Sequence, residues 1–148
     1  MQHEHYMRLA LEQADLARQK GEVPIGAVAS MGGKVIAAKH NSSISRTDPT
    51  AHAEILVLRS AARKLGVYRL EGLEIYVTLE PCLMCFGAML HARVARLVYG
   101  ADDPKVGMSR ILQSHLQEAH FNHRIEIIRG ILAEECSALL HGFFQDRR

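Results

Sequence analysis

The spacing of apolar residues and the positions of helix-start residues predict four helices. The first covers residues 3–20, the second starts at one of residues 48–50 and ends at about 65, the third starts at Pro81, and the fourth covers 133–145. The first helix is expected to end where Gly21 interrupts the helical rhythm. The second should begin at Asp48-Pro49-Thr50, because aspartate or threonine can cap a helix and proline suits its first turn. For the same reason Pro81 is expected to be the first residue of the third helix.

Short apolar segments between these helices predict five strands, over residues 25–30, 35–39, 75–79, 97–99 and 125–128. The turn at 31–34 joins the first two strands as a hairpin, and Gly100 should close the fourth. We expect a loop at residues 41–47, and a loop with some helix at residues 102–123. Strands that alternate with helices after an initial hairpin are typical of an α/β domain with a mixed sheet between helical layers. We expect one such domain over residues 1–148.

Composition is that of an ordinary globular protein, with 48% hydrophobic and 23% charged residues. No apolar run reaches the roughly 20 residues needed to cross a bilayer, and the first residues lack the basic and apolar regions of an export signal. We therefore expect no membrane association and a cytoplasmic location. Three cysteines in such a chain favour metal binding, catalysis or burial over a disulfide framework. The net charge of +2 permits an RNA partner without arguing for one.

Two short motifs carry the candidate chemistry, His52-Ala53-Glu54 and Pro81-Cys82-Leu83-Met84-Cys85, each at an expected helix N-terminus. Cys82 and Cys85 are three positions apart, so they share one helix face and can bind one ion together. His52 can supply a third ligand. Three protein ligands leave the fourth tetrahedral position of zinc for water, which is the arrangement of a catalytic site.

Glu54 follows His52 by two residues and can approach a water at the metal without being a ligand. Zinc lowers the pKa of bound water to around 7, and a neighbouring carboxylate can move the protons that deamination requires. His-x-Glu together with Pro-Cys-x-x-Cys is the signature of zinc deaminases. The pattern therefore predicts one Zn²⁺ per chain held by His52, Cys82 and Cys85, with Glu54 as the catalytic residue.

Other interpretations of the cysteines explain fewer residues. A lone Cys-x-x-Cys is more often half of a structural zinc site or a redox pair, but the chain has no second such motif, and a redox pair leaves His52 and Glu54 without a role. Cys136 lies among leucines and isoleucines of the last helix and is expected to be buried core.

The chain resembles the bacterial tRNA adenosine deaminase family over nearly its whole length. The resemblance rests on the segments Val23-Pro24-Ile25-Gly26-Ala27-Val28, Asn41, Asp48 to Glu54, Tyr68-Arg69-Leu70, Tyr76 to Cys82, Asn122-His123-Arg124 and Phe143-Phe144. It implies a three-layer α/β/α cytidine-deaminase-like fold with a central mixed five-stranded sheet. It also implies a homodimer whose active sites lie near the subunit interface. The implied reaction is hydrolysis of adenosine to inosine at the wobble position of an arginine tRNA, bound by its anticodon stem-loop.

Carried over by position, the resemblance assigns eight residues to substrate binding. Asn41 would hydrogen-bond the target nucleoside, and the Ala53 backbone would contact the flipped base. The remaining six would contact other nucleotides of the RNA: Asp103, Lys105, Asn122 and His123 in the anticodon loop, and Phe144 and Arg148 on flanking RNA. Each has a structural alternative. Asn41 could shape a turn, the segments at 103 and 122 could be ordinary loops, and both Phe143 and Phe144 could be core, which is the favoured role for Phe143.

The segment Gly107 to Leu112 departs from the family, because larger side chains stand where glycine and serine are usual. A changed loop shape here would affect the RNA contacts expected of Asp103 and Lys105 but not the zinc chemistry. Two other functions stay open. One is a deaminase of a free base or nucleoside such as guanine, cytidine or adenosine. The other is a non-catalytic RNA-binding subunit, which the presence of Glu54 disfavours.

Overall fold

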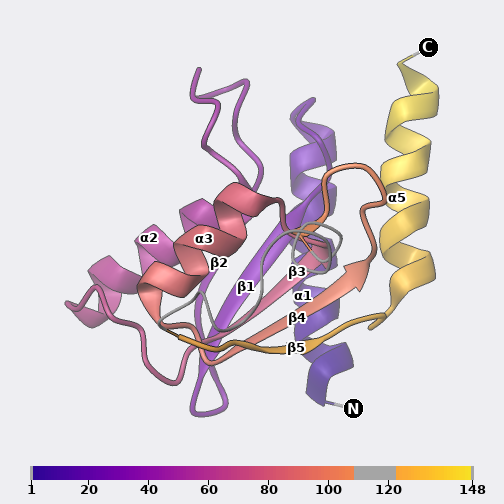
Figure 1. Ribbon diagram of the computed structural model, residues 1–148. Helices are drawn as coiled ribbons and strands as arrows, with labels where there is room; N and C mark the ends of the chain where they lie inside the picture. The colour runs from indigo at the N-terminus through magenta and orange to yellow at the C-terminus, as the bar shows by residue number, and fades with distance from the viewer. Residues whose placement is uncertain (1, 109–122, 148) are drawn as a thin grey trace.

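The structure is a computed structural model that describes residues 2–108 and 123–147. Within these residues the elements follow the order α1 (Gln2–Gln19), β1 (Gly26–Met31), β2 (Lys34–His40), α2 (Ala53–Leu65), β3 (Glu74–Leu79), α3 (Leu83–Ala92), β4 (Arg96–Ala101), β5 (Glu126–Ile128) and α5 (Ala133–Asp146) (Figure 1). The hairpin, the strand positions and the first and last helices are those that the hydrophobic pattern predicts.

The five strands form one mixed sheet in the order β2-β1-β3-β4-β5. Strand β1 is antiparallel to both β2 and β3, whereas β3, β4 and β5 are parallel to one another. The carboxyl ends of β3 and β4, at Leu79 and Ala101, therefore meet at the same edge of the sheet. In open α/β sheets this edge is where ligands usually bind.

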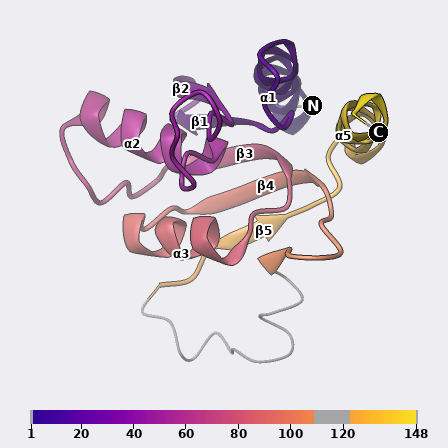
Figure 2. The same cartoon turned by 90° about the horizontal axis from the view of Figure 1, so that it is seen from above.

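Helices cover both faces of the sheet, as expected (Figure 2). Because side chains alternate along a strand, Ile75 and Val77 pack on the face covered by α2 and α3, and Tyr76 packs on the opposite face with α1 and α5. Cys136 on α5 is buried in this second layer, as its sequence context predicts. Among the described residues, no helix is long and apolar enough to span a bilayer.

The second helix begins at Ala53, so the predicted start at 48–50 is wrong. The Asp48 carboxylate accepts hydrogen bonds from the backbone N–H and the hydroxyl of Thr50, at 2.9 and 2.8 Å, and these close a local turn. Such aspartate turns compete with helix formation. His52 keeps an extended conformation and is the N-cap residue of α2.

The third helix begins at Leu83 rather than at Pro81, with Cys82 as its N-cap residue. Cys82 remains extended because it forms a β-bridge with Gly107, and the Met108 N–H donates to the Pro81 carbonyl at 3.0 Å. The pairing with a segment far along the chain delays the helix by two residues.

Strand β4 continues through Gly100, which was expected to end it. A Cβ at this position would lie 2.4 Å from Cys136 Sγ, so glycine is required here by the close approach of α5 and not by a turn. Within the segment 102–123, residues 102–107 form a loop, and residues 109–122, which include 109–112 of the departing segment, lie outside the described residues.

Candidate active site

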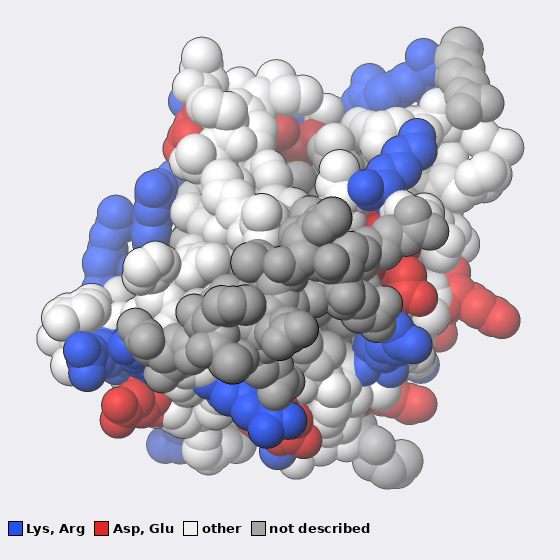
Figure 3. All heavy atoms as spheres, viewed as in Figure 1, with Lys and Arg blue, Asp and Glu red and all other residues white. Residues whose placement is uncertain are grey.

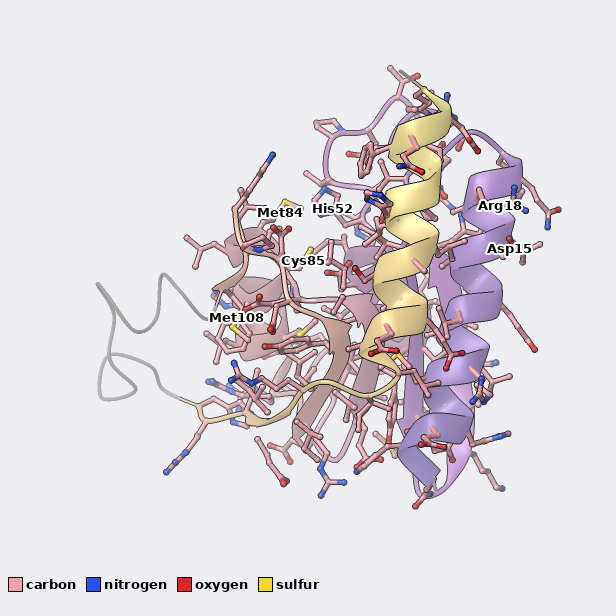
Figure 4. The ribbon with its side chains drawn as sticks, turned by 90° about the vertical axis from the view of Figure 1, so that its right-hand side faces the viewer. Asp15, Arg18, His52, Met84, Cys85 and Met108 are labelled. Atoms are coloured by element: carbon pink, nitrogen blue, oxygen red, sulfur yellow. The ribbon has the colours of Figure 1, made fainter. Side chains whose placement is uncertain are left out.

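The N-termini of α2 and α3 bring three metal-binding side chains together. His52 Nδ1 lies 3.4 Å from Cys85 Sγ and 3.7 Å from Cys82 Sγ. All three ligand atoms lie within 4.8 Å of one another. In Figure 4, His52 and Cys85 are next to each other at the edge of the sheet.

The donor set fits a zinc ion. For tetrahedral zinc with Zn–S near 2.3 Å and Zn–N near 2.05 Å, the sulfur and nitrogen ligands should be roughly 3.6 Å apart, and the two observed separations of 3.4 and 3.7 Å bracket this value. One imidazole and two thiols also match the ligand preferences of zinc. Three side chains leave one coordination position for a small molecule.

The three groups also shift one another's pKa values. Hydrogen bonds from Cys85 and then from His52 lower the pKa of Cys82 to about 4. The hydrogen bond to Cys82 and burial raise the pKa of Cys85 far above the usual range of a thiol. The hydrogen bond with Cys82 raises the pKa of His52. Cysteine binds zinc as the thiolate, so metal binding at Cys82 and Cys85 releases protons and depends on pH.

Glu54 lies in the first turn of α2 and is only 4% exposed. Burial raises the pKa of its carboxyl to about 7. Glu54 lines the same cavity as His52 and Cys82, which places it beside the metal-binding group. A carboxyl group with a pKa near neutrality can both accept and release a proton at physiological pH.

These groups open onto a cavity of about 550 Å³ at the carboxyl ends of β3 and β4. Its polar lining includes Asn41, His52, Glu54, Cys82 and Glu80. The loop after β4 contributes residues 102–106, and the apolar part of the lining consists of Val23, Ile25, Leu79, Leu140 and Phe144. The arrangement can hold a flat, partly apolar ligand against a metal and a proton-transfer group.

The sequence matches the MafB19-like deaminase family over residues 1–148. It is 49% identical over 147 residues to the tRNA-specific adenosine deaminase of Bacillus subtilis, covering 99% of this chain and 91% of that protein. This chain belongs to the tRNA-specific adenosine deaminase family. It is therefore an enzyme, and its zinc-type ligand set agrees with that assignment.

Solved structures confirm the cytidine-deaminase-like fold. A structure from a study of A-to-I editing by tRNA:A34 deaminases at the wobble position of transfer RNA has a TM-score of 0.84 and 44% identity, covering 92% of this chain and 99% of that chain. The guanine deaminase of Bacillus subtilis has a TM-score of 0.68 and 32% identity, covering 100% of this chain and 94% of that chain.

Asn41 and Ala53 meet beside the deaminase cavity. The buried Asn41 side chain accepts a hydrogen bond of 2.8 Å through Oδ1 from the Ala53 backbone N–H. Asn41 lines the cavity, whereas Ala53 is fully buried and its N–H is bound to Asn41. Asn41 also has a structural role, because its side chain caps the first turn of α2 through this hydrogen bond.

Asp103 and Lys105 both line the cavity. Asp103 Oδ1 accepts hydrogen bonds from the backbone N–H groups of Lys105 and Val106, at 3.0 and 3.2 Å, which gives the loop a fixed turn. Phe144 is 49% exposed and lines the cavity, whereas Phe143 is buried as favoured.

The structure does not bring His123 to the cavity. Its Nε2 lies 2.7 Å from the carbonyl oxygen of Val94, just before β4 begins, and it is absent from the cavity lining. Asn122 and Arg148 lie outside the described residues.

Sequence reasoning did not single out several lining residues, among them Glu80, Asp102 and Val106. Glu80 lies inside a segment that carries the family resemblance, but nothing in the sequence indicates that its side chain turns toward the loop after β4. That information depends on how two strands end at one edge of the sheet.

Proposed function

We propose that this enzyme hydrolyses adenosine to inosine at the wobble position of a tRNA anticodon loop, with an arginine tRNA as substrate. The observation that carries the proposal is the placement of Glu54 beside the His52–Cys82–Cys85 group in a cavity of about 550 Å³. The similarity to a structure studied for A-to-I editing at the wobble position supports the choice of substrate.

We also propose that His52, Cys82 and Cys85 hold one Zn²⁺ per chain. When bound, the ion supplies a Lewis acid that lets water ionise near neutral pH. Glu54 accepts a proton from the attacking water and delivers protons to the adenine ring and to the departing amino group. A C–O bond forms at the ring carbon, the exocyclic C–N bond breaks, and adenosine and water become inosine and ammonia.

The other lining residues bind and orient the substrate. Asn41 and the Ala53 backbone are the proposed contacts to the flipped nucleoside: Asn41 lines the cavity, and Ala53 is bound to it and precedes Glu54. Phe144 and Val106 offer exposed apolar surface on which neighbouring bases can stack. Asp103 and Lys105 are proposed to contact the anticodon loop, as are Asn122 and His123, although His123 does not line the cavity in this structure. Arg148 is proposed to contact flanking RNA.

Basic side chains support an RNA partner. Lys105 lines the cavity and Arg147 directly follows α5, the helix that contributes Phe144 to it, and other Lys and Arg side chains are spread over the face shown in Figure 3. Positive charge near the opening attracts the RNA backbone. We place the enzyme in the cytoplasm with its tRNA substrate.

We further propose a homodimer formed through the surface of α2 and α3. A groove between these helices, of about 440 Å³, is lined largely by apolar side chains including Ile55, Leu58 and Tyr68. Tyr68 is 75% exposed in the isolated chain and extends the apolar surface of this groove, as an interaction surface requires. Light scattering at micromolar concentration checks this proposal, and a monomer of 16.5 kDa that still deaminates RNA would contradict it.

Deamination of a free base is the second candidate, because the guanine deaminase of Bacillus subtilis shares the fold at 32% identity. A non-catalytic role is disfavoured, since Glu54 lies in the cavity. Inosine formation on total tRNA, followed by sequencing, identifies the modified position and tests the tRNA proposal. Absence of new inosine at any wobble position would contradict it.

A further inference from the structure

Glu80 is a buried carboxylate to which the chemistry described above gives no role. It follows β3 directly, lies two residues before Cys82, is 3% exposed and lines the cavity. Buried carboxylates are costly unless they are bound by hydrogen-bond donors, so its contacts indicate what it is for.

Glu80 binds the segment after β4 through both its backbone and its side chain. The Glu80 N–H donates to the carbonyl of Ala101 at 2.8 Å. The Glu80 Oε1 atom accepts a hydrogen bond of 2.9 Å from the backbone N–H of Asp103. Two separate bonds therefore hold the start of the loop formed by residues 102–107 against the end of β3.

The other end of this loop also packs on the carboxylate of Glu80. A Cβ added at Gly107 would lie 2.3 Å from Glu80 Oε1 and 2.4 Å from the carbonyl oxygen of Asp103. The Gly107 N–H donates to that carbonyl at 3.1 Å, and Gly107 forms the β-bridge with Cys82. The loop thus closes around Glu80, and glycine is required at 107 because the backbone approaches so closely.

The loop held in this way supplies one wall of the cavity, through residues 102–106. Asp103 and Lys105, the proposed contacts to the anticodon loop, both belong to it. Glu54 and the three candidate metal ligands lie on other segments, at the starts of α2 and α3. Loss of the Glu80 contact should therefore move the substrate-binding wall while leaving the proton-transfer group in place.

We propose that Glu80 is a positioning residue for substrate binding: by holding the 102–107 loop over the cavity, its carboxylate sets the affinity for the anticodon loop and not the rate of the chemical step. This inference rests on the proposed tRNA function. It assigns Glu80 and Gly107 a common role: Glu80 supplies the hydrogen-bond acceptor, and the missing side chain of Gly107 leaves space for the Glu80 carboxylate.

Three variants test the proposal. Glu80→Gln keeps an oxygen acceptor for the Asp103 N–H, Glu80→Ala removes it, and Gly107→Ala pushes the loop away. Glu74→Ala is the matched control, because Glu74 begins the same strand at the opposite end and binds Arg96 and Ser30 far from the cavity. Steady-state kcat and KM on an anticodon stem-loop are measured for each, with metal content and thermal melting.

Glu80→Ala and Gly107→Ala should each raise KM by roughly tenfold or more, the range for losing a hydrogen bond to a charged group. In Glu80→Ala, kcat should stay within about threefold of the original value, as for a loss of uniform binding, and metal content should be unchanged. Gly107→Ala is judged by KM alone, because Gly107 also pairs with the candidate metal ligand Cys82, and Glu80→Gln and Glu74→Ala should keep a near-normal KM. A fall in kcat at constant KM or loss of metal in Glu80→Ala, or the same KM change in Glu74→Ala or Glu80→Gln, would each overturn the proposal.

Hydrogen exchange separates this inference from the tRNA assignment. If the original protein shows no activity on the stem-loop, the proposed function fails, and the loop can still be tested on its own. The Asp103 and Gly107 amides should exchange faster in Glu80→Ala than in Glu80→Gln or the original protein. Equal exchange in all three would overturn the role of Glu80 whatever the substrate.

Discussion

Asn41 and Ala53 are joined by a hydrogen bond of 2.8 Å that links the end of β2 to the first turn of the helix carrying Glu54. The bond satisfies a backbone N–H that has no partner within the helix. The same side chain lines the cavity, so that it both supports the helix and forms part of the cavity wall.

Asn41→Ala should lower both stability and turnover. Loss of a helix-capping acceptor costs about 1 kcal/mol, and somewhat more where the N–H is buried. Asn41→Asp is the matched control, because it keeps the acceptor for Ala53 but loses the amide N–H donor. We expect Asp to restore most of the free energy of unfolding while turnover stays impaired. Full turnover in Asn41→Asp, measured with single-turnover kinetics, would show that the amide donor has no role in binding the nucleoside.

Glu54→Gln should abolish turnover and leave the metal content unchanged. A general acid–base group contributes about 10²–10⁴-fold, and here one group serves several proton transfers, so the loss should reach the upper end of this range. Turnover close to normal, with metal content near one per chain, would show that Glu54 does not transfer the protons.

The same variant should change how stability depends on pH in the metal-free protein. Burial raises the pKa of Glu54 from 4.5 to about 7, so the folded state holds this proton more tightly than the unfolded state. The free energy of unfolding should therefore fall as pH rises from about 4.5 to 7 because of this group. Glutamine does not titrate, so the free energy of unfolding of Glu54→Gln minus that of the original protein should increase as pH rises over this interval. A constant difference would contradict the buried, raised-pKa carboxyl.

Metal binding should depend on His52, Cys82 and Cys85 and not on Cys136. Purified protein should contain close to one zinc per chain, and Cys82→Ala or His52→Ala should lose it. Cys136→Ala is the matched control, since Cys136 is buried against Gly100 and away from the cavity. Removal of zinc by a chelator should lower the melting temperature, because the metal binds the folded state alone. Elemental analysis that finds neither zinc, iron nor manganese after gentle purification would contradict the metal site.

Lys105→Ala should weaken binding of the stem-loop and reduce its dependence on salt. Each lost phosphate contact to a single strand lowers the log–log slope by about 0.7. Lys34→Ala is the matched control, because Lys34 lies at the turn of the β1–β2 hairpin and does not line the cavity. An unchanged slope in fluorescence-anisotropy titrations of Lys105→Ala would show that Lys105 makes no phosphate contact.

The residues that carry chemistry were predictable because their motifs are local. His52 and Glu54 lie two positions apart and Cys82 and Cys85 three, and each pair lies at the start of a helix. The order of segments along the chain, a hairpin followed by strands that alternate with helices, likewise predicted the mixed sheet. These features depend on neighbours along the chain, where local rules apply.

Most of the features that differ from the sequence-based prediction depend on contacts between segments that are distant along the chain. The start of α3 moved because Cys82 pairs with Gly107, and β4 continued through Gly100 because Cys136 approaches it. The later start of α2 has a local cause: Asp48, expected to cap the helix, instead closes a turn with Thr50. Glu80 acquires its contacts only when the ends of β3 and β4 meet, so no spacing rule could assign it a role.

We propose that the substrate is a wobble adenosine in an anticodon loop. A loop base is already partly unstacked, so placing it in the cavity costs less than the few kcal/mol needed to extrude a base from a duplex. The most direct measurement compares kcat/KM for an anticodon stem-loop with adenosine at the wobble position, the same sequence in a full duplex, and free adenosine, cytidine and guanine. We expect the highest kcat/KM for the stem-loop, with inosine formed at the wobble position. Equal rates on the stem-loop and the duplex, or a higher kcat/KM for a free base or nucleoside, would contradict it.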